Sequence, residues 1–279
     1  MINLTLLYDS IRWEEKSLFN AAKKLDINMN MLDCKDLSID LESNDTLGTV
    51  LQRCVSYYRN IHSTAALEGI GTRTINSLNT GIFAGNKLYT HMLLRKFNVP
   101  TPRATVSFSK DSALQVLKND GYPKIIKPTV GSWGRMVSKI NDLDSAMGIL
   151  EGRESMYPIY QIHYMEEFVK RPPRDIRAIV VGDRVVAAIY RNSGSGWKTN
   201  MALGGVAEPC KVNDEMQEIC IRAKDAVEGE IVGVDLMESD GGLVVHEINN
   251  TTEFKNTVRV CDVDIPTQII QYVLDIARR

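Results

Sequence analysis

The sequence lacks the features that mark membrane proteins, disulfide-stabilised scaffolds and zinc sites. No apolar run in its 279 residues approaches the about 18–20 residues of a membrane-spanning helix. The five cysteines are odd in number and show no C-x-x-C spacing, and the four histidines are scattered. We therefore expect no zinc site and reduced thiols in a cytoplasmic protein. The first residues carry no basic segment and no small-residue cleavage site, so they predict a strand and not a signal peptide.

The sequence also lacks an excess of charge of either sign. Lys plus Arg number 33 and Asp plus Glu 35, so no global charge recruits nucleic acid or a membrane surface. There is no repeat, no low-complexity segment, and no G-x-G-x-x-G after the first predicted strand, which makes a dinucleotide site a weak interpretation. Hydrophobic residues at 44% and charged residues at 24% are typical of a globular protein with an ample core.

The first third of the chain alternates strands with helices. Residues 13–25 carry apolar side chains at helical spacing, and Glu14 and Glu15 lie in the first turn, where the helix dipole favours acids. Such alternation predicts a parallel sheet with helices on both faces. We expect this α/β domain to span residues 1–86, with strands at 2–8, 27–32, 49–55 and 74–76 and helices at 13–25 and 63–68.

The remaining two thirds, residues 87–279, predict an α+β arrangement with a central subdomain at about residues 100–172. Gly182-Asp183 joins two predicted strands, residues 175–181 and 184–190, into a hairpin. Further strands are expected at 124–128, 136–140 and 160–169, and helices at 86–96, 111–118, 144–150, 216–228 and 265–276.

The most informative stretch is a second predicted hairpin, in which residues 233–238 and 241–250 flank the turn Ser239-Asp240-Gly241-Gly242. Asp235, Glu247 and Asn249 place oxygen-bearing side chains among Val, Leu and Ile, and the last two share a strand face. Apolar strands do not bury carboxylates without a compensating cation. Hard oxygen ligands suit Mg²⁺ or Mn²⁺ held with phosphate oxygens. The alternative is a pair of strand acids that face solvent.

A glycine-containing loop and two lysines supply the groups that bind phosphates. Gly131-Ser132-Trp133-Gly134-Arg135 joins two predicted strands, and its glycines let backbone N–H groups approach a phosphate closely. Lys127 ends the preceding strand, and Lys87 opens a helix. Such a loop alone is more often a mere turn. Together with the acids of the second hairpin, these groups predict phosphoryl transfer.

In this order, these parts resemble the ATP-grasp superfamily of carboxylate–amine ligases. Within it, the chain is similar to the RimK-like branch, and especially to the amino-carrier-protein ligases of lysine and arginine biosynthesis. The stretches that carry the resemblance span nearly the whole chain: residues 7–9 with Arg12, 53–56, 127–128, 131–135, 174–177, 188–191, 204–205 and 249–256. The G-S-W-G-R loop and the N-x-T-x-E-F-K-N stretch are the most specific of them.

The resemblance implies an N-terminal open-sheet domain followed by an ATP-grasp domain, and it implies roles for individual residues. Lys87 and Lys127 would bind ATP phosphates, with the loop of Gly131, Ser132, Trp133, Gly134 and Arg135 closing over them. Adenine would lie against a strand of Glu166, Glu167, Phe168 and Val169, with its acids and Asp175 as ribose candidates. Asp235, Glu247 and Asn249 would hold Mg²⁺, and Arg177, Arg191 and Asn200 would face the transferring phosphoryl group. The amine pocket would comprise Asn250, Thr251, Thr252, Glu253, Phe254 and Asn256.

The resemblance also implies the reaction and the substrates. A carboxylate would attack the γ-phosphoryl group of ATP to give an acyl phosphate, and an amine would then displace phosphate to form an amide. The carboxylate would belong to the C-terminal glutamate of a small acidic carrier protein, LysW, and the amine to 2-aminoadipate or to glutamate. The sequence around Asn256 resembles the aminoadipate-specific type, but the two amines differ by only one methylene, so dual specificity stays open. We also expect a homo-oligomer.

Charged residues of the front domain form a second candidate region. Arg12, Arg53 and Arg59 lie near predicted strand ends beside Trp13 and two tyrosines, a mixture common at interfaces. They predict a docking surface for the carrier that acts separately from the amine pocket. Ordinary surface charge is the simpler interpretation of these arginines.

Two other classes of protein stay open from the sequence. One is a different ATP-grasp ligase, such as a RimK-type glutamate-adding enzyme or a glutathione-synthetase-like peptide ligase. The other is a non-catalytic nucleotide-binding regulator, against which the intact Lys127, Asp235, Glu247 and Asn249 argue, because a degenerate enzyme would usually have lost a metal ligand.

Overall fold

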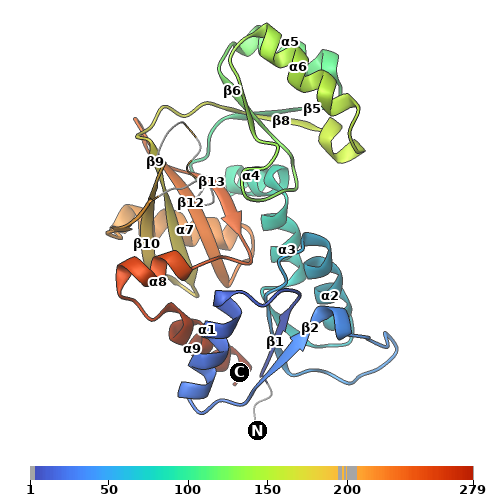
Figure 1. The fold of residues 1–279 in the computed structure, drawn as a ribbon, viewed down its shortest axis with the longest axis vertical. Coiled ribbons are helices and arrows are strands. Elements are labelled where there is room, and N and C mark those ends of the chain that lie inside the picture. The colour runs from blue at the N-terminus through green and yellow to red at the C-terminus, as the bar shows by residue number, and fades with distance from the viewer. Residues whose placement is uncertain (1–3, 194–196, 198, 200–205, 279) are drawn as a thin grey trace.

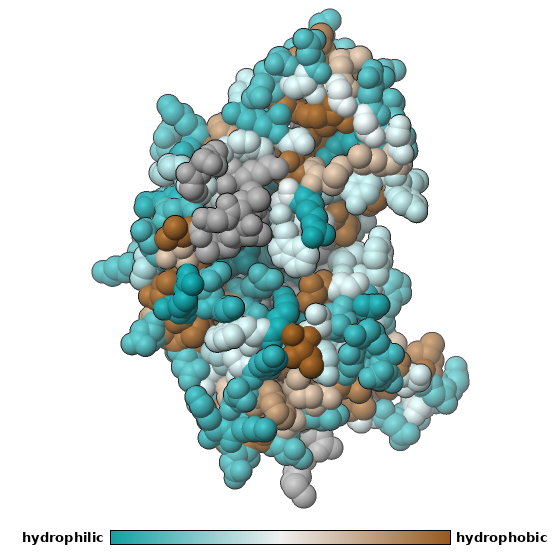
Figure 2. Space-filling view, viewed as in Figure 1, coloured by the Kyte–Doolittle hydropathy of each residue, from teal (hydrophilic) through white to brown (hydrophobic). Residues whose placement is uncertain are grey.

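The computed structural model describes residues 4–193, 197, 199 and 206–278, and it arranges three sheets one above another (Figure 1). The N-terminal sheet lies at the bottom of the view, a five-stranded sheet in the middle, and a smaller four-stranded sheet at the top. On the face seen in Figure 2, hydrophilic residues predominate and hydrophobic ones are scattered. No helix in the described part of the chain has both the length and the apolar character needed to span a bilayer. All five cysteines are free thiols.

The front domain is the predicted α/β unit. Its four strands are all parallel, in the order β2-β1-β3-β4. Leu6 packs with helix α1 on one face of the sheet, and Leu7 packs with helix α2 on the other, so the prediction of helices on both faces is confirmed. The elements are β1 (Leu4–Tyr8), α1 (Trp13–Lys24), β2 (Met29–Asp33), a 3₁₀ turn (Cys34–Asp36), β3 (Thr49–Gln52), α2 (Tyr57–Gly69) and β4 (Arg73–Ile75).

Helix α2 begins six residues before its predicted start at Ser63. Its first turn contains the exposed Tyr58 and Arg59, so no apolar periodicity marks it. The turn is fixed from outside the helix, because Asp9 at the end of β1 accepts the backbone N–H of Val55 at 2.8 Å and of Ser56 at 3.1 Å. Asp9 is therefore a buried structural acid and not a surface charge.

The middle sheet carries the predicted hairpins in an antiparallel order, β11-β10-β9-β12-β13. Helix α7 covers one face. On the other face, α8 packs against β10 and β11, and α9 packs against both β9 and helix α1 of the front domain. The C-terminal helix thus ties the two domains into one core. The elements are β9 (Arg174–Val181), β10 (Arg184–Asn192), β11 (Val206–Cys210), α7 (Asp214–Ala226), β12 (Ile231–Ser239), β13 (Gly242–Asn249), α8 (Lys255–Cys261) and α9 (Ile265–Ala277).

The top sheet is a lid with two helices on its outer side. Its strands run antiparallel in the order β5-β8-β6-β7, and Leu117 and Leu150 from the two helices bury Ile126 of the sheet. The predicted strand at 160–169 is shorter, since a 3₁₀ turn occupies Pro158–Gln161. The elements are β5 (Ala104–Ser107), α5 (Lys110–Asp120), β6 (Lys124–Lys127), β7 (Ser138–Ile140), α6 (Leu143–Glu154) and β8 (His163–Glu167), preceded by α3 (Leu78–Gly85) and α4 (Lys87–Lys96).

One face of β9 determines where a site can form. Its inner residues Ile176 and Ala178 pack in the core under α7. On the opposite face, Ile179 lies in the core shared with α9, whereas Asp175 lines a cavity together with residues of the lid, and Arg177 lies between these two positions on the same face. This single strand face is therefore apolar toward the front domain and charged toward the lid.

A close approach at Gly233 joins β12 to the chain that follows β13. A methyl group on Gly233 would come within 2.9 Å of Thr252 Cβ and closer still to its Oγ1. We expect Gly233→Ala to destabilise the fold by about 1–3 kcal/mol, because the neighbour is a fully buried side chain that has no room to move. Gly241→Ala in the same hairpin is the matched control, since a Cβ there meets only Ser239 Oγ at 3.9 Å. Denaturant unfolding of both variants measures the difference, and equal stabilities would contradict the packing argument.

Candidate active site

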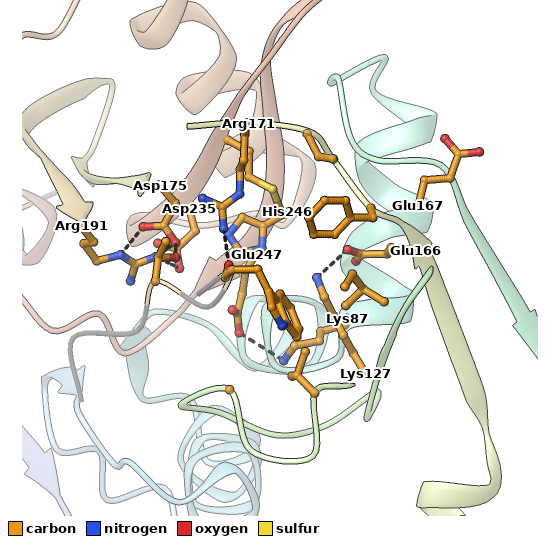
Figure 3. Close-up of a pocket in the computed structure, with 18 of the residues that line it drawn as sticks. Lys87, Lys127, Glu166, Glu167, Arg171, Asp175, Arg191, Asp235, His246 and Glu247 are labelled. Atoms are coloured by element: carbon orange, nitrogen blue, oxygen red, sulfur yellow. Dashed lines mark hydrogen bonds and ion pairs between the residues drawn. The ribbon is translucent and has the colours of Figure 1, made fainter. Parts of the chain in front are cut away.

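A cavity of about 280 Å³ lies between the lid and the middle sheet (Figure 3). Apolar side chains of the lid, Ile125 and Val137, and of the middle sheet, Met237, line one part of it, and cations line another. This combination suits a ligand with a flat apolar end and an anionic end. The predicted nucleotide-binding residues that line the cavity are Lys87, Lys127, Gly131, Ser132, Gly134, Arg135, Glu166, Glu167, Phe168, Val169 and Asp175.

Trp133 is the one predicted nucleotide-binding residue that does not line the cavity. Its side chain is 48% exposed, and the guanidinium of Arg135 lies 5.1 Å from the ring centroid. Trp133 and Gly134 both have positive φ, at 58° and 65°. Residues other than glycine adopt this backbone conformation rarely. The loop therefore leaves the side chain of Trp133 outside the cavity, whereas its neighbours Ser132 and Gly134 line the cavity.

The two predicted phosphate-binding lysines are paired with acids. Lys127 Nζ lies 2.5 Å from Glu166 Oε2, and the other oxygen of Glu166 accepts the Tyr164 hydroxyl at 2.9 Å. Burial and the neighbouring Glu166 raise the pKa of Tyr164, so the phenol stays protonated and donates. Lys87 Nζ donates to Gly131 O at 2.6 Å and lies 3.1 Å from Glu247 Oε1. Lys87 thus connects the phosphate loop to the second hairpin.

Charged side chains form a row across four strands of the middle sheet. Arg191 on β10 lies opposite Asp175 on β9, Arg177 on β9 lies opposite Asp235 on β12, and Asp235 lies opposite Glu247 on β13. Arg191 Nη2 is 2.9 Å from both Asp175 Oδ2 and Asp235 Oδ2, and Arg177 binds both oxygens of Asp235. Within β9, β10 and β12 each charge in the row thus has an opposite charge on the neighbouring strand, whereas Glu247 on β13 lies opposite another acid, Asp235, and has its cation, Lys87, on α4.

The arginines determine the charge state of Asp235. Burial raises the pKa of its carboxyl, but the guanidinium groups of Arg177 and Arg191 outweigh burial and hold the pKa well below its usual range. Asp235 is therefore a carboxylate at any physiological pH, with cations already gathered around it.

The donor set fits a divalent cation that prefers oxygen. Asp235 and Glu247 are register neighbours and both line the cavity, and carboxylate oxygens are the ligands that Mg²⁺ prefers. Asn249 lies two residues further along β13 but does not line the cavity. Its Nδ2 is buried without a partner among the described residues. The described residues contain no group of three or more His, Cys, Asp and Glu that could hold a metal, as expected for two acids and an amide.

The sequence analysis did not assign several of the cavity residues to the site, and three of them have polar side chains of interest. His246 and Arg171 line the cavity, and Thr199 does so while its hydroxyl donates to Asp175. His246 stands between Val245 and Glu247, where strict alternation would turn it away from the face of Glu247, so only its residue type offered a signal. Arg171 donates to Trp197 O at 3.1 Å. The predicted catalytic residue Asn200 lies outside the described residues.

The predicted amine stretch lies against the front domain and not in the cavity. Asn250 Nδ2 donates to Asn60 Oδ1 at 3.2 Å, and Thr251 Oγ1 donates to Cys54 O at 3.3 Å. Asn256 is partly exposed in the first turn of α8. The stretch therefore bridges the middle sheet and the front domain, and only its polar members have exposed surface for an amine.

Phe254 departs from the predicted amine-binding role. Its side chain is fully buried in the core shared with α1 and α9, and its ring lies 6.0 Å from that of Trp13 in an edge-on arrangement. Its backbone N–H donates to Glu14 Oε1 at 3.2 Å. Phe254 anchors the amine stretch to the front domain.

Two of the three arginines predicted to form a separate docking surface for the carrier instead contact the amine stretch. Arg53 is 3% exposed; its Nε lies 3.2 Å from Glu15 Oε1 and its Nη2 donates to Thr252 O at 3.1 Å. Arg12 binds Glu15 and reaches Glu253 at 3.3 Å. Of the three arginines, only Arg59 has a mostly exposed side chain. Arg53 is therefore a buried residue and not a surface charge, and it contacts the amine stretch directly through Thr252.

The phosphate loop yields a prediction about dynamics. Lys87 holds its start at Gly131 O, whereas Trp133 and Met136 are exposed. We expect amide hydrogen exchange at residues 131–135 to be fast without nucleotide and slowed when nucleotide phosphates accept hydrogen bonds from the loop. Exchange mass spectrometry with and without a non-hydrolysable ATP analogue measures this, and α7 serves as the unchanged control. Equally slow exchange of the loop in both states would contradict its role.

Comparison with known proteins agrees with this geometry. The signature of the RimK-like ATP-grasp domain matches residues 84–273, and that of the LysX preATP-grasp domain matches residues 4–82. The crystal structure of a RimK domain ATP-grasp protein from Sphaerobacter thermophilus superposes with a TM-score of 0.78 at 19% identity, covering 97% of this chain and 99% of that one. The fold is thus that of the ATP-grasp proteins.

Sequence relatives place the chain more narrowly. The alpha-aminoadipate–LysW ligase LysX of Sulfurisphaera tokodaii is 39% identical, with 97% of each chain covered. The glutamate–LysW ligase ArgX of Sulfolobus acidocaldarius is 32% identical, with 98% of each chain covered. The chain belongs to the RimK-like ATP-grasp family, and it is an ATP-dependent ligase that joins an acid to an amino acid. Both the predicted family and the predicted two-part fold are confirmed. ATP-grasp ligases use ATP and a divalent metal.

Proposed function

We propose that this ligase joins the α-amino group of 2-aminoadipate to the side-chain carboxylate of the C-terminal glutamate of the carrier protein LysW. The observation that carries the proposal is similarity to LysX relatives over nearly the whole chain, at 38–39% identity. ArgX relatives are 32–33% identical over the same length. The aminoadipate type is therefore favoured over the glutamate type.

The cavity supports the activation of a carboxylate by ATP. The phosphates would be neutralised and oriented by Lys87, Lys127 and the loop at residues 131–135. Adenine would lie against the strand segment at residues 166–169. Asp235, Glu247 and Asn249 would hold Mg²⁺, or Mn²⁺, which when bound adds charge neutralisation at the phosphates. The transferring phosphoryl group would be faced by Arg177, Arg191 and Asn200. Trp133 would close over the phosphates with the rest of its loop.

The proposed chemistry has two steps. A carboxylate oxygen of the carrier attacks the γ-phosphorus, the bond to the β–γ bridging oxygen breaks, and ADP leaves. The amine nitrogen then attacks the acyl carbon, phosphate departs with the former carboxylate oxygen, and the amine loses a proton. The protein acts by positioning and charge neutralisation, so no covalent nucleophile is required.

The amine would lie beside the stretch from Asn250 to Asn256. Asn250, Thr251 and Asn256 are partly exposed, whereas Thr257 is 1% exposed. Selection between aminoadipate and glutamate concerns one methylene, worth about 1–3 kcal/mol in a fitted pocket. Among these positions, we assign this selection to Asn256, because its side chain is partly exposed whereas that of the next residue, Thr257, is buried.

Product analysis tests the proposed substrates. The ligase is incubated with purified LysW, MgATP and either aminoadipate, glutamate or an equimolar mixture, and the intact mass of the carrier is measured. We expect the carrier to gain one aminoadipate residue, and aminoadipate to dominate in the mixture. Preferential gain of glutamate would assign the protein to arginine biosynthesis instead, and an unmodified carrier would contradict the proposal.

A further inference from the structure

His246 owes its position to an irregularity in the second hairpin. Asp235 pairs with Glu247 and Leu236 pairs with Val245, so His246 is an extra residue on β13 without an opposite partner. Such a β-bulge re-aims side chains and is common beside active sites. Val245 and Ile248 lie in the core under α7, whereas His246 and Glu247 both line the cavity. Strict alternation could not place both of them there.

The imidazole of His246 has no partner of its own. Both ring nitrogens are buried, and neither has a hydrogen-bond partner among the described residues, although part of the side chain is exposed. A neutral imidazole carries one N–H donor and one acceptor, so His246 has two ring nitrogens to satisfy. Buried polar groups are nearly always hydrogen-bonded in folded proteins, which points to a ligand as the missing partner.

The place of His246 in the cavity identifies which part of a nucleotide it would meet. Asp235 and Glu247 lie on one side of it along the hairpin, and Met237 lies on the other, in register with Val244. In Figure 3 the imidazole lies between Asp235 and Glu166. A nucleotide whose phosphates approach the acids and lysines, and whose base approaches the apolar residues, would place its ribose at this point.

The acids that the sequence offered for the ribose are already engaged. Asp175 is bound by Arg191 and by the Thr199 hydroxyl, and Glu166 by Lys127 and Tyr164. Glu167 points away from the cavity centre, toward Lys124 at 3.8 Å (Figure 3). His246, by contrast, has ring nitrogens that no described residue engages, so a neutral imidazole there can both donate to and accept from a hydroxyl group.

We propose that His246 hydrogen-bonds a ribose hydroxyl group of the bound nucleotide and thereby contributes to the selection of ribonucleotides. The inference rests on the proposed nucleotide site but does not depend on the carrier, the amine or the metal. A single hydrogen bond between neutral groups corresponds to about a 3–10-fold change in affinity.

A double-mutant cycle between protein and ligand tests the inference. Dissociation constants of ADP, 2′-deoxy-ADP and 3′-deoxy-ADP are measured by calorimetry, in EDTA and in Mg²⁺, for wild type, His246→Ala and His246→Asn. We expect wild type to lose about 3–10-fold in affinity toward one deoxynucleotide, His246→Ala to lose the same toward ADP, and the two losses not to add. His246→Asn keeps a donor and an acceptor and should retain part of the discrimination.

The control is Glu247→Gln, which should weaken binding in Mg²⁺ but keep the discrimination between ADP and the deoxynucleotides. If His246→Ala retains full discrimination, or if wild type binds the three nucleotides equally, His246 does not contact the ribose. If the wild-type protein binds no adenine nucleotide, the proposal that this cavity is a nucleotide site is contradicted, and with it the role of His246. Should His246→Ala not fold, as judged by circular dichroism, His246→Leu replaces it under the same criteria, because leucine also lacks both ring nitrogens.

Discussion

Glu247→Gln should reduce ligation by about 100-fold or more while leaving the fold intact, because it removes a proposed carboxylate ligand of the divalent metal that would neutralise phosphate charge. Glu247 lies opposite Asp235 and 3.1 Å from Lys87, so it connects the proposed metal site to a phosphate-binding lysine. The substitution keeps the size of the side chain and removes only the carboxylate. Asn249→Ala should have an effect in the same direction, since it deletes the third oxygen of the set.

Turnover at saturating MgATP, with circular dichroism as a check on folding, measures these effects. The matched control is Glu215→Gln, because Glu215 supports the same hairpin by accepting the Leu243 N–H at 3.1 Å but lies on α7, outside the cavity. It should retain activity within a few-fold of wild type. Wild-type turnover in Glu247→Gln would show that the metal assignment is wrong.

Arg53→Met should cost about 3–5 kcal/mol of stability, because it leaves the buried carboxylate of Glu15 with less compensation and Thr252 O without its donor. Arg12 also binds Glu15, which places the expected cost toward the lower end. Since Thr252 belongs to the amine stretch, we also expect the KM values for carrier and amino acid to rise together.

Denaturant unfolding and steady-state kinetics measure these effects. Arg59→Met is the matched control, since its side chain is 53% exposed and its nearest acid is Asp9 at 3.7 Å, and surface changes of this kind stay within about 0.5 kcal/mol. An Arg53→Met protein as stable as Arg59→Met would contradict the buried network. If only the KM for the carrier rose, Arg53 would act in carrier docking separately from the amine stretch, and the expected coupling would be contradicted.

The sequence predicted those parts of the site that depend on local pattern. Alternating apolar residues around Gly241-Gly242 predicted the second hairpin, and Asp235 and Glu247 are indeed register neighbours on it. Strand–helix alternation predicted the parallel front sheet. Both features arise within a short segment, where side-chain period and turn residues are sufficient.

The features that were missed depend on pairs of distant segments. The bulge at His246 is a mismatch between two strands, so neither strand shows it alone. Helix α8 contains Thr257, Val258 and Val260, which favour strands, and it forms by packing on β10 and β11. Arg53 was interpreted as a surface charge because its partner Thr252 lies 199 residues away in the sequence.

We propose above all that this cavity activates a carboxylate as an acyl phosphate. Carrier protein labelled with ¹⁸O in its C-terminal glutamate side chain tests it directly, with aminoadipate and MgATP present and the released phosphate analysed by mass spectrometry. The account predicts one ¹⁸O atom in each phosphate, together with ADP, because the attacking carboxylate oxygen leaves with the phosphoryl group. Unlabelled phosphate, or AMP and pyrophosphate in place of ADP, would contradict it.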